Sequence, residues 1–325
     1  MGEGTEALAP LADRLRTLGV PHLAGEPLRR HTTFGIGGPA GLFVEPDTTA
    51  ALAAALDALR EAGVPWFVVG LGSNLLVSDR GYPGVVLSLL RAGRELAVRG
   101  DRLEAGAGVP LAKAAHAAQA AGLSGLEYAI SIPGSVGGAV AMNAGAHGAA
   151  TADVLEAVTL WSPEDGVVEL AADALGFAYR YSRVHERPWV VLAARFRLVP
   201  ADPGRVLALM RRHMAYRKAT QPVGERNAGS MFKNPPEGRA GALIEAVGAK
   251  GWTEGGAHVS RLHANFIINT GDATARDVLT LMRRVRRAVM ERFGAVLRPE
   301  VRWVGPPEGE AGTSWETLWL REDSG

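Results

Sequence analysis

The order of apolar and polar positions predicts alternating helices and strands over the first two hundred residues. Apolar side chains recur every three or four residues in some segments and alternate with polar ones in others. The helical spacing predicts helices at 5–18, between Asp47 and Gly63, and at 111–121. The strand pattern predicts strands at 66–69, 85–89, 95–98, 102–105, 154–161, 167–170 and 189–199. Turn-forming residues at 100–101 predict a hairpin of the strands 95–98 and 102–105, and those at 162–166 predict a hairpin of the strands 154–161 and 167–170.

The pattern starts again after Pro200–Gly204, which we interpret as a linker. Beyond it we predict helices at 205–216, 241–247 and 274–293, and a strand at 263–269. Thr274 and Asp277 have the spacing of a helix-capping pair. From Pro306 the chain is acidic and polar, and we expect a mobile tail there. The chain is therefore α+β, with a first region over 1–200, a second over 205–305 and a tail over 306–325.

Three glycine-rich stretches interrupt these elements, at 32–38, 69–75 and 131–148. The longest is too rich in glycine to form a helix or strand that packs by its side chains. Glycines leave backbone N–H groups exposed and allow an anion to approach closely. Each stretch alone is typical of a tight turn, but together they indicate a long ligand with a central diphosphate, such as a flavin dinucleotide. The Rossmann fingerprint is incomplete, because Leu75 stands where its third glycine belongs.

Composition excludes several classes of function. The 325 residues carry a net charge of +1, and they include no cysteine, which excludes disulfides and iron–sulfur ligation. The eight histidines show no paired metal-binding spacing, so we expect no metal. The basic cluster at 283–287 shares its helix with an apolar face, so we interpret it as a solvated surface and expect no nucleic-acid binding. With no signal peptide and no apolar run of ~20 residues, we expect a cytoplasmic protein without membrane insertion.

Motifs in the same order over about 28–305 resemble the UDP-N-acetylenolpyruvoylglucosamine reductase family, also called UDP-N-acetylmuramate dehydrogenases. They are His31-Thr-Thr-Phe-Gly-Ile-Gly-Gly38, Val69-Gly-Leu-Gly-Ser-Asn-Leu-Leu76, the run 125–148, Tyr179-Arg-Tyr-Ser182, Gly229-Ser-Met-Phe-Lys-Asn-Pro235, 259–266 and Pro299-Glu-Val-Arg-Trp303. The resemblance implies an α+β fold: an FAD-binding domain of the vanillyl-alcohol-oxidase (PCMH) type, here 1–200 with subdomains of about 1–90 and 91–200. A smaller C-terminal substrate-binding lobe over 205–305 completes it.

The resemblance also implies a cofactor site for non-covalent FAD, with NADPH as co-substrate. The diphosphate is expected on two of the glycine loops, at Gly70–Leu75 and at Gly134–Gly138. The implied contacts are Thr33, Gly70, Leu71, Gly72, Ser73, Asn74, Leu75, Ile132, Pro133, Gly134, Ser135, Gly137, Gly138 and Ala141.

The implied reaction reduces the enolpyruvyl ether of a UDP-sugar nucleotide to UDP-N-acetylmuramate, a step of peptidoglycan precursor synthesis for the cell wall. Hydride addition leaves an enolate conjugated to the carboxylate, and this enolate is then protonated. Arg180 matches the arginine that stabilises the growing negative charge, and a guanidinium suits that task. Ser230 matches the proton donor and Glu300 the third catalytic group. Only folding brings these three residues together.

Substrate contacts implied by the family are Lys218, Gln221, Asn234 and Lys250, each of which is also compatible with a solvated side chain. Some family members carry an inserted tyrosine clamp. Here the only tyrosines between Arg180 and Ser230 are Tyr181 and Tyr216, on a predicted turn and a predicted helix. We therefore expect the shorter class without the insertion. We also expect a monomer.

Two other functions fit the glycine loops. An FAD-linked oxidase of the same fold would keep the loops but has no need of Ser230, Asn234 and Glu300 in these motifs. A non-catalytic module that binds a nucleotide sugar is the second alternative, and the candidates for all three chemical roles argue against it.

Overall fold

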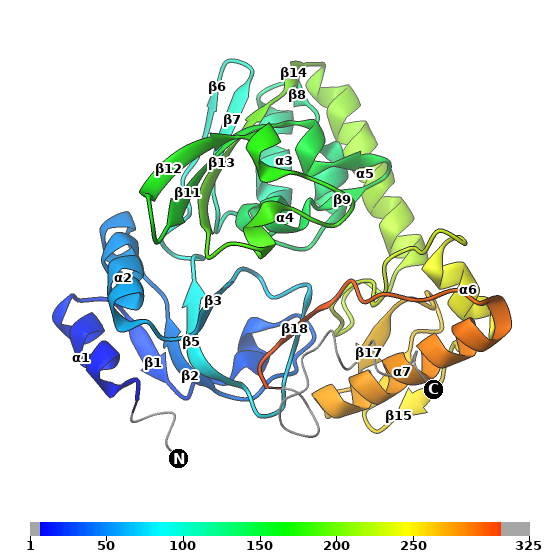
Figure 1. Ribbon diagram of the computed structural model, residues 1–325. Coiled ribbons are helices and arrows are strands. Elements are labelled where there is room, and N and C mark those ends of the chain that lie inside the picture. The colour runs from blue at the N-terminus through cyan, green and yellow to red at the C-terminus, as the bar shows by residue number, and fades with distance from the viewer. Residues whose placement is uncertain (1–6, 307–325) are drawn as a thin grey trace. The chain divides into compact units, whose positions relative to one another are not determined.

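The computed structural model describes residues 7–306, and these residues form two compact units (Figure 1). Within that range, unit 1 contains residues 7–24, 42–71 and 84–219, and unit 2 contains residues 25–41, 72–83 and 220–306. Each unit is thus assembled from segments that are not contiguous in sequence. This division follows packing, so the predicted ligand-binding domains at 1–200 and 205–305 stay a prediction.

Unit 1 holds most of the regular structure. Its helices are α1 (Ala9–Thr17), α2 (Thr49–Ala62), α3 (Leu111–Ala120), α4 (Val136–Met142) and α5 (Pro203–Thr220), of which the last residue falls in unit 2. Its strands are β1 (His22–Ala24), β3 (Trp66–Val69), β6 (Leu96–Arg99), β7 (Arg102–Gly106), β8 (Leu123–Ser124), β9 (Gly145–Ala146), β10 (Ala149–Ala150), β11 (Leu155–Ser162), β12 (Gly166–Ala171), β13 (Val190–Arg197) and β14 (Val199–Pro200). Strands β2 (Ala40–Val44) and β5 (Tyr82–Ser88) begin in unit 2 and continue into unit 1.

Two sheets organise unit 1. The first has the order β1-β2-β5-β3, with β3 and β5 parallel, and the second is an antiparallel sheet of order β12-β11-β13-β7-β6. Along β13, Ala194 and Phe196 are buried and alternate with Arg195 and Arg197, as a sheet with one covered face requires. Helices α3 and α4 pack against the second sheet (Figure 1), and Phe196 joins their apolar residues in one core.

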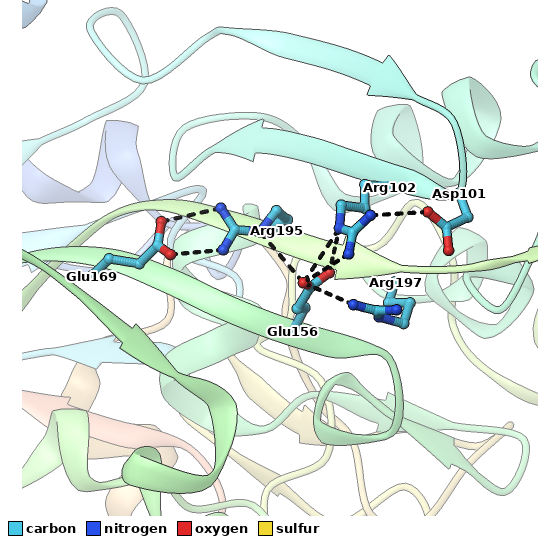
Figure 2. Close-up of polar contacts among 6 residues, drawn as sticks. All are labelled: Asp101, Arg102, Glu156, Glu169, Arg195 and Arg197. Carbon is cyan, nitrogen blue, oxygen red and sulfur yellow. Dashed lines mark hydrogen bonds and ion pairs between the residues drawn. The ribbon is translucent and has the colours of Figure 1, made fainter.

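The other face of the second sheet carries a ladder of ion pairs (Figure 2). Glu156 on β11 accepts from Arg102 at 2.9 Å and from Arg197 at 3.0 Å, while Arg195 pairs with Glu169 at 2.7 Å. The hydrogen bond from Arg102 is the largest effect that lowers the pKa of Glu156, and the bond from Arg197 adds to it. Glutamates of β12 and β11 pair with arginines of β13 and β7, so the charges on this solvated face are electrostatically satisfied.

Unit 2 is built around one long helix. Its elements are β4 (Leu75–Val77), α6 (Ala240–Ala246), β15 (Thr253–Glu254), β16 (Ala257–Val259), β17 (Ile267–Asn269), α7 (Ala275–Phe293) and β18 (Arg302–Val304). Helix α7 packs on the antiparallel sheet β15-β16-β17, and β18 pairs in parallel with β4. The core joins Leu281, Met282 and Val285 of the helix to Phe34 and Phe232.

Local sequence signals explain the helix ends that the structure confirms. Thr48 accepts the N–H of Ala51 at the start of α2, and Gly63 ends that helix with a φ of 62°. Thr274 and Asp277 form the predicted capping box of α7. Both predicted hairpins are present, as β6–β7 and β11–β12.

Four predictions are wrong. The stretch 131–148 contains helix α4. The Oγ of Ser135 accepts the N–H of Gly138 at 3.4 Å and caps the helix, and Val136, Ala139 and Val140 form its buried face. Helix α5 begins at Pro203, inside the predicted linker, since Asp202 accepts the N–H of Arg205 at 2.8 Å. Of the strand predicted at 263–269, only Ile267–Asn269 is a strand, because the N–H of Phe266 bonds back to His263 in a turn. In the basic cluster of α7, Arg286 is buried with 7% exposure, so that cluster is not wholly solvated.

Two further predictions fall on residues beyond the described range. Helix α1 begins at Ala9, and the predicted helix start at Thr5 lies outside the described residues. The tail beyond Pro306 also lies outside them.

Candidate active site

Two of the glycine loops, at 69–75 (the first loop) and at 131–148 (the second loop), meet within unit 1. Strand β3 ends at Val69, and a Cβ atom on the next residue, Gly70, would lie 2.3 Å from the Oγ of Ser135. Gly137 is also close to its surroundings, because its Cβ would lie 2.8 Å from the Cβ of Ala107. Glycine is therefore needed at both positions for the two loops to approach their neighbours.

Both loops line one cavity of about 90 Å³ in unit 1. Five predicted cofactor contacts lie on its wall, namely Gly70, Ser135, Gly137, Gly138 and Ala141. The rest of the wall is apolar and includes Trp189 and Val191 at the start of β13. A flavin dinucleotide is far larger, so the cavity accounts for only part of any such site.

Gly138 tests whether the second loop fits a cofactor. It is exposed and has no positive φ, and a Cβ atom there would find its nearest atom, the Oγ of Ser135, at 3.5 Å. Neither backbone strain nor packing within the chain explains the lack of a side chain. The close approach of a ligand does, so the loop fits a flavin dinucleotide.

The continuation of the first loop lies in unit 2. Gly72 has a φ of 63°, and its Cβ would lie 2.0 Å from the carbonyl oxygen of His31. Its own carbonyl accepts the N–H of Thr33 at 3.2 Å, and Thr33 donates its hydroxyl to Asn227 at 2.7 Å. Among these predicted cofactor contacts, Gly72 and Thr33 hold the loop together.

Asn74 connects this loop to Glu300. Its amide nitrogen donates to the carbonyl of Glu300 at 3.1 Å, and its carbonyl accepts the N–H of Arg302 at 2.9 Å. Leu75, the next residue, pairs with Arg302 where β4 and β18 run in parallel. The main chain at Glu300 is therefore fixed by a residue of the glycine loop.

Ser230 and Glu300 are brought together in unit 2 although they lie far apart in sequence. The N–H of Glu300 donates to Met231, the neighbour of Ser230, at 2.8 Å, and Phe232 forms a bridge with Pro299. Both Ser230 and Glu300 are half-buried. The residue before Ser230 is Gly229, whose φ of 76° explains why glycine stands there.

Arg180 lies in unit 1, in a tight turn. Ala178 and Tyr181 exchange main-chain hydrogen bonds of 3.1 and 3.2 Å around it, and Arg180 has a φ of 55°. Its Nη2 donates to the carbonyl of Gly145 at 2.9 Å, and its guanidinium carbon lies 5.0 Å from the centre of the Tyr179 ring. Because Arg180 and the pair Ser230/Glu300 belong to different units, their convergence stays a prediction.

Comparisons with known proteins decide the family. The model of the UDP-N-acetylenolpyruvoylglucosamine reductase C-terminal domain matches residues 221–304, and that of an FAD binding domain matches residues 40–171. UDP-N-acetylenolpyruvoylglucosamine reductase 2 of Symbiobacterium thermophilum is 47% identical over 301 residues, which cover 91% of this chain and 97% of that protein. The chain belongs to the UDP-N-acetylenolpyruvoylglucosamine reductase family.

Other members of this reductase family agree. The reductase of Heliobacterium modesticaldum is 46% identical over 286 residues, covering 88% of this chain and 91% of its own length. The crystal structure of the reductase from Thermus caldophilus matches with a TM-score of 0.74 and 37% identity, covering 88% of this chain and 98% of that one. The predicted fold class, an FAD-binding domain of the PCMH type with a C-terminal α+β domain, is confirmed.

Two of the four residues that the reductase family suggests for substrate contact have partners within the chain. Asn234 accepts the N–H of Ala240 at 3.0 Å, at the start of α6. Lys250 pairs with Glu245 at 2.5 Å. Lys218 is exposed near the end of α5. Gln221 is half-buried and is the first residue after that helix. None of these positions is brought to a common point by a contact within the described residues, so their substrate role stays a prediction.

Two of the histidines near the motifs, His147 and His263, have lowered pKa values. Burial lowers the pKa of His147, whose ring stacks on His213 at 3.9 Å between centroids and shares a hydrogen bond of 3.0 Å with Ser131. Burial also lowers the pKa of His263, and nearby Lys250 adds to the effect. These imidazoles are therefore held toward the neutral form. Between residues 7 and 306, no group of three or more His, Asp or Glu side chains gathers as a metal site.

Sequence reasoning missed two kinds of residue. The apolar wall of the cavity, including Trp189 and Val191, comes from a strand whose alternation shows only that one face is buried. Asn143 and Ser182, which contact the two sides of the Arg180 turn, were also missed. The one available signal was the asparagine itself at position 143, since asparagine tolerates the left-handed backbone that the structure shows there. No helix in the described part of the chain has the length and apolarity to cross a membrane.

Proposed function

We propose that this chain catalyses the NADPH-dependent reduction of UDP-N-acetylglucosamine-enolpyruvate to UDP-N-acetylmuramate, with non-covalently bound FAD. As a family member it is an FAD-dependent oxidoreductase of peptidoglycan precursor synthesis. The observation that supports the reaction most directly is the main-chain pairing that joins the segments of Ser230 and Glu300. An oxidase acting on another substrate has no need for these two groups to be neighbours.

The glycine loops supply the cofactor site in this proposal. The backbone of Gly134–Gly138 and Gly70–Leu75 would hold the diphosphate, and the apolar wall beside Trp189 would contact a less polar part of the cofactor. The chemistry that bound FAD would supply is the transfer of hydride from NADPH to the enolpyruvyl group. The chain offers no second dinucleotide motif, so we infer that NADPH and the sugar nucleotide occupy one pocket in turn.

The side chains carry out the remaining chemistry. Arg180 binds the substrate carboxylate with its guanidinium and stabilises the enolate, because its charge is permanent and its N–H groups form a fork. Ser230 donates its hydroxyl proton to the enolate carbon, which is a strong base. Glu300, whose main chain is tied to the segment of Ser230, assists this proton transfer. Lys218, Gln221, Asn234 and Lys250 are the proposed contacts to the nucleotide diphosphate. NADPH and nucleotide sugars are metabolites of the cytoplasm, where we place the reaction.

Two half-reactions measured without oxygen test this proposal. We expect purified protein to be yellow, to be bleached by NADPH, and to regain its colour rapidly with the enolpyruvyl sugar nucleotide but slowly with air. Rapid recovery with air and none with the sugar nucleotide would indicate an oxidase instead. A colourless protein that binds the sugar nucleotide would indicate a binding module.

Ser230→Ala tests the proton donor within the same assay. We expect normal flavin content and normal bleaching by NADPH, with slow recovery on adding the sugar nucleotide. Ser230→Cys is the matched control, because its thiol restores a proton donor of similar size. If Ser230→Ala recovers as fast as the natural chain, Ser230 is not the acid.

A further inference from the structure

The turn that carries Arg180 has an unfavourable backbone. Arg180 has a φ of 55°, in the left-handed region that is unfavourable for residues other than glycine. Only three residues other than glycine have a positive φ within residues 7–306, and they are Asn143, His147 and Arg180. Such a conformation persists only where surrounding contacts hold it.

Three contacts hold this turn against the segment that ends helix α4. The side-chain amide of Asn143 donates to the carbonyl of Ala178, where the chain enters the turn, at 3.0 Å. The hydroxyl of Ser182, where the chain leaves the turn, donates to the carbonyl of Ala141 at 2.7 Å. Arg180 itself donates from Nη2 to the carbonyl of Gly145 at 2.9 Å. All of these residues belong to unit 1.

Asn143 is well suited to the first of these contacts. It caps the C-terminus of α4 with a φ of 42°, a left-handed conformation that asparagine tolerates. Its side-chain oxygen accepts the N–H of Ala152 at 3.0 Å while its nitrogen donates to Ala178. With 8% of its surface exposed, the amide is held from both sides, and only a group that both donates and accepts satisfies both partners.

We propose that Asn143 is a positioning residue for the proposed reaction: it fixes the strained turn that presents Arg180 to the substrate carboxylate. Ser182 supports the same turn from its other side. This inference rests on the role of Arg180 in the proposed function. Helix α4 begins at the glycine loop proposed for FAD and ends at Asn143. The two ends of one short helix therefore position the loop proposed for the cofactor and the turn that carries Arg180.

Asn143→Asp is the sharpest test, because it keeps the size, the acceptor and the tolerance of a left-handed backbone. It replaces the donor to Ala178 with a negatively charged carboxylate oxygen and so sets two oxygens against each other. We expect unchanged bleaching by NADPH, and roughly tenfold slower recovery with the enolpyruvyl sugar nucleotide, since one hydrogen bond is worth about that factor. Ser182→Ala is the second variant, and we expect the same signature from it. Flavin content measured alongside shows that each variant is folded.

A double variant separates positioning from a general structural role. If Asn143 acts through Arg180, adding Asn143→Asp to Arg180→Ala leaves the already slow recovery rate unchanged. A further tenfold loss in the double variant would overturn the inference, and so would an equal slowing of both half-reactions by Asn143→Asp alone. If the natural chain itself fails to recover with the enolpyruvyl sugar nucleotide, the proposed function is wrong rather than this inference.

Discussion

Gly72 and Gly138 are both predicted cofactor contacts, yet the structure gives opposite reasons for their lack of a side chain. A Cβ on Gly72 would lie 2.0 Å from the carbonyl oxygen of His31 and 2.7 Å from the Cα of Thr32, at a φ of 63°. A Cβ on Gly138 would meet nothing closer than 3.5 Å, in an ordinary helical conformation. Substituting alanine at each position therefore separates folding from cofactor binding.

The expected cost of Gly72→Ala follows from these contacts. A left-handed alanine costs about 1–2 kcal/mol and overpacking about 1–3 kcal/mol, so the free energy of unfolding falls by about 2–5 kcal/mol. That is a large share of the roughly 5–15 kcal/mol that keeps a domain folded. Gly138→Ala introduces no clash and improves helix propensity by up to about 1 kcal/mol, so the flavin-free protein keeps or gains stability.

Two measurements on each variant complete the comparison. Urea unfolding of flavin-free protein gives stability, and flavin fluorescence during titration with FAD gives affinity. We expect Gly72→Ala to lose stability, and Gly138→Ala to keep stability but bind FAD more weakly. Natural affinity for FAD in Gly138→Ala, or a loss of flavin-free stability equal to that of Gly72→Ala, would refute the reasoning.

Three other predictions follow from single features of the molecule. Thr274→Ala removes the cap of α7 and lowers the free energy of unfolding by about 1 kcal/mol. Thr280→Ala on the same helix removes an exposed hydroxyl that donates to the carbonyl of Arg276 one turn earlier, where that carbonyl is already part of the helix, so it shifts the urea midpoint little. The pKa of Glu156 lies below its ordinary 4.5, so the stabilising effect of this carboxylate is fully present above pH 4.5 and is lost as the pH falls through the lowered pKa. In Glu156→Gln, the fall of the unfolding temperature over this acidic range should therefore be smaller. If NADPH and the sugar nucleotide share one pocket, initial rates plotted in double-reciprocal form give parallel lines, and intersecting lines would contradict the shared pocket.

The elements that the sequence predicted correctly depend on short-range signals. The capping pair at Thr274 and Asp277, and the turn residues between β6 and β7, act within a few positions of each other. The errors occur where packing outweighs local preference. Helix α4 forms from small residues because a serine cap and a buried face stabilise it, and Arg286 is buried on a helix whose arginines looked solvated.

The sequence by itself determined the family, the fold class and the motifs that carry the candidate chemistry, since residue types in a fixed order are properties of the chain. Only the tertiary structure decided that the segments of Ser230 and Glu300 pair, and that Asn74 fixes the main chain beside them. It alone revealed that Arg180 occupies a strained turn held by Asn143. The physical reason is that hydrogen bonds between distant segments, and the backbone angles that they enforce, depend on which segments meet when the chain folds.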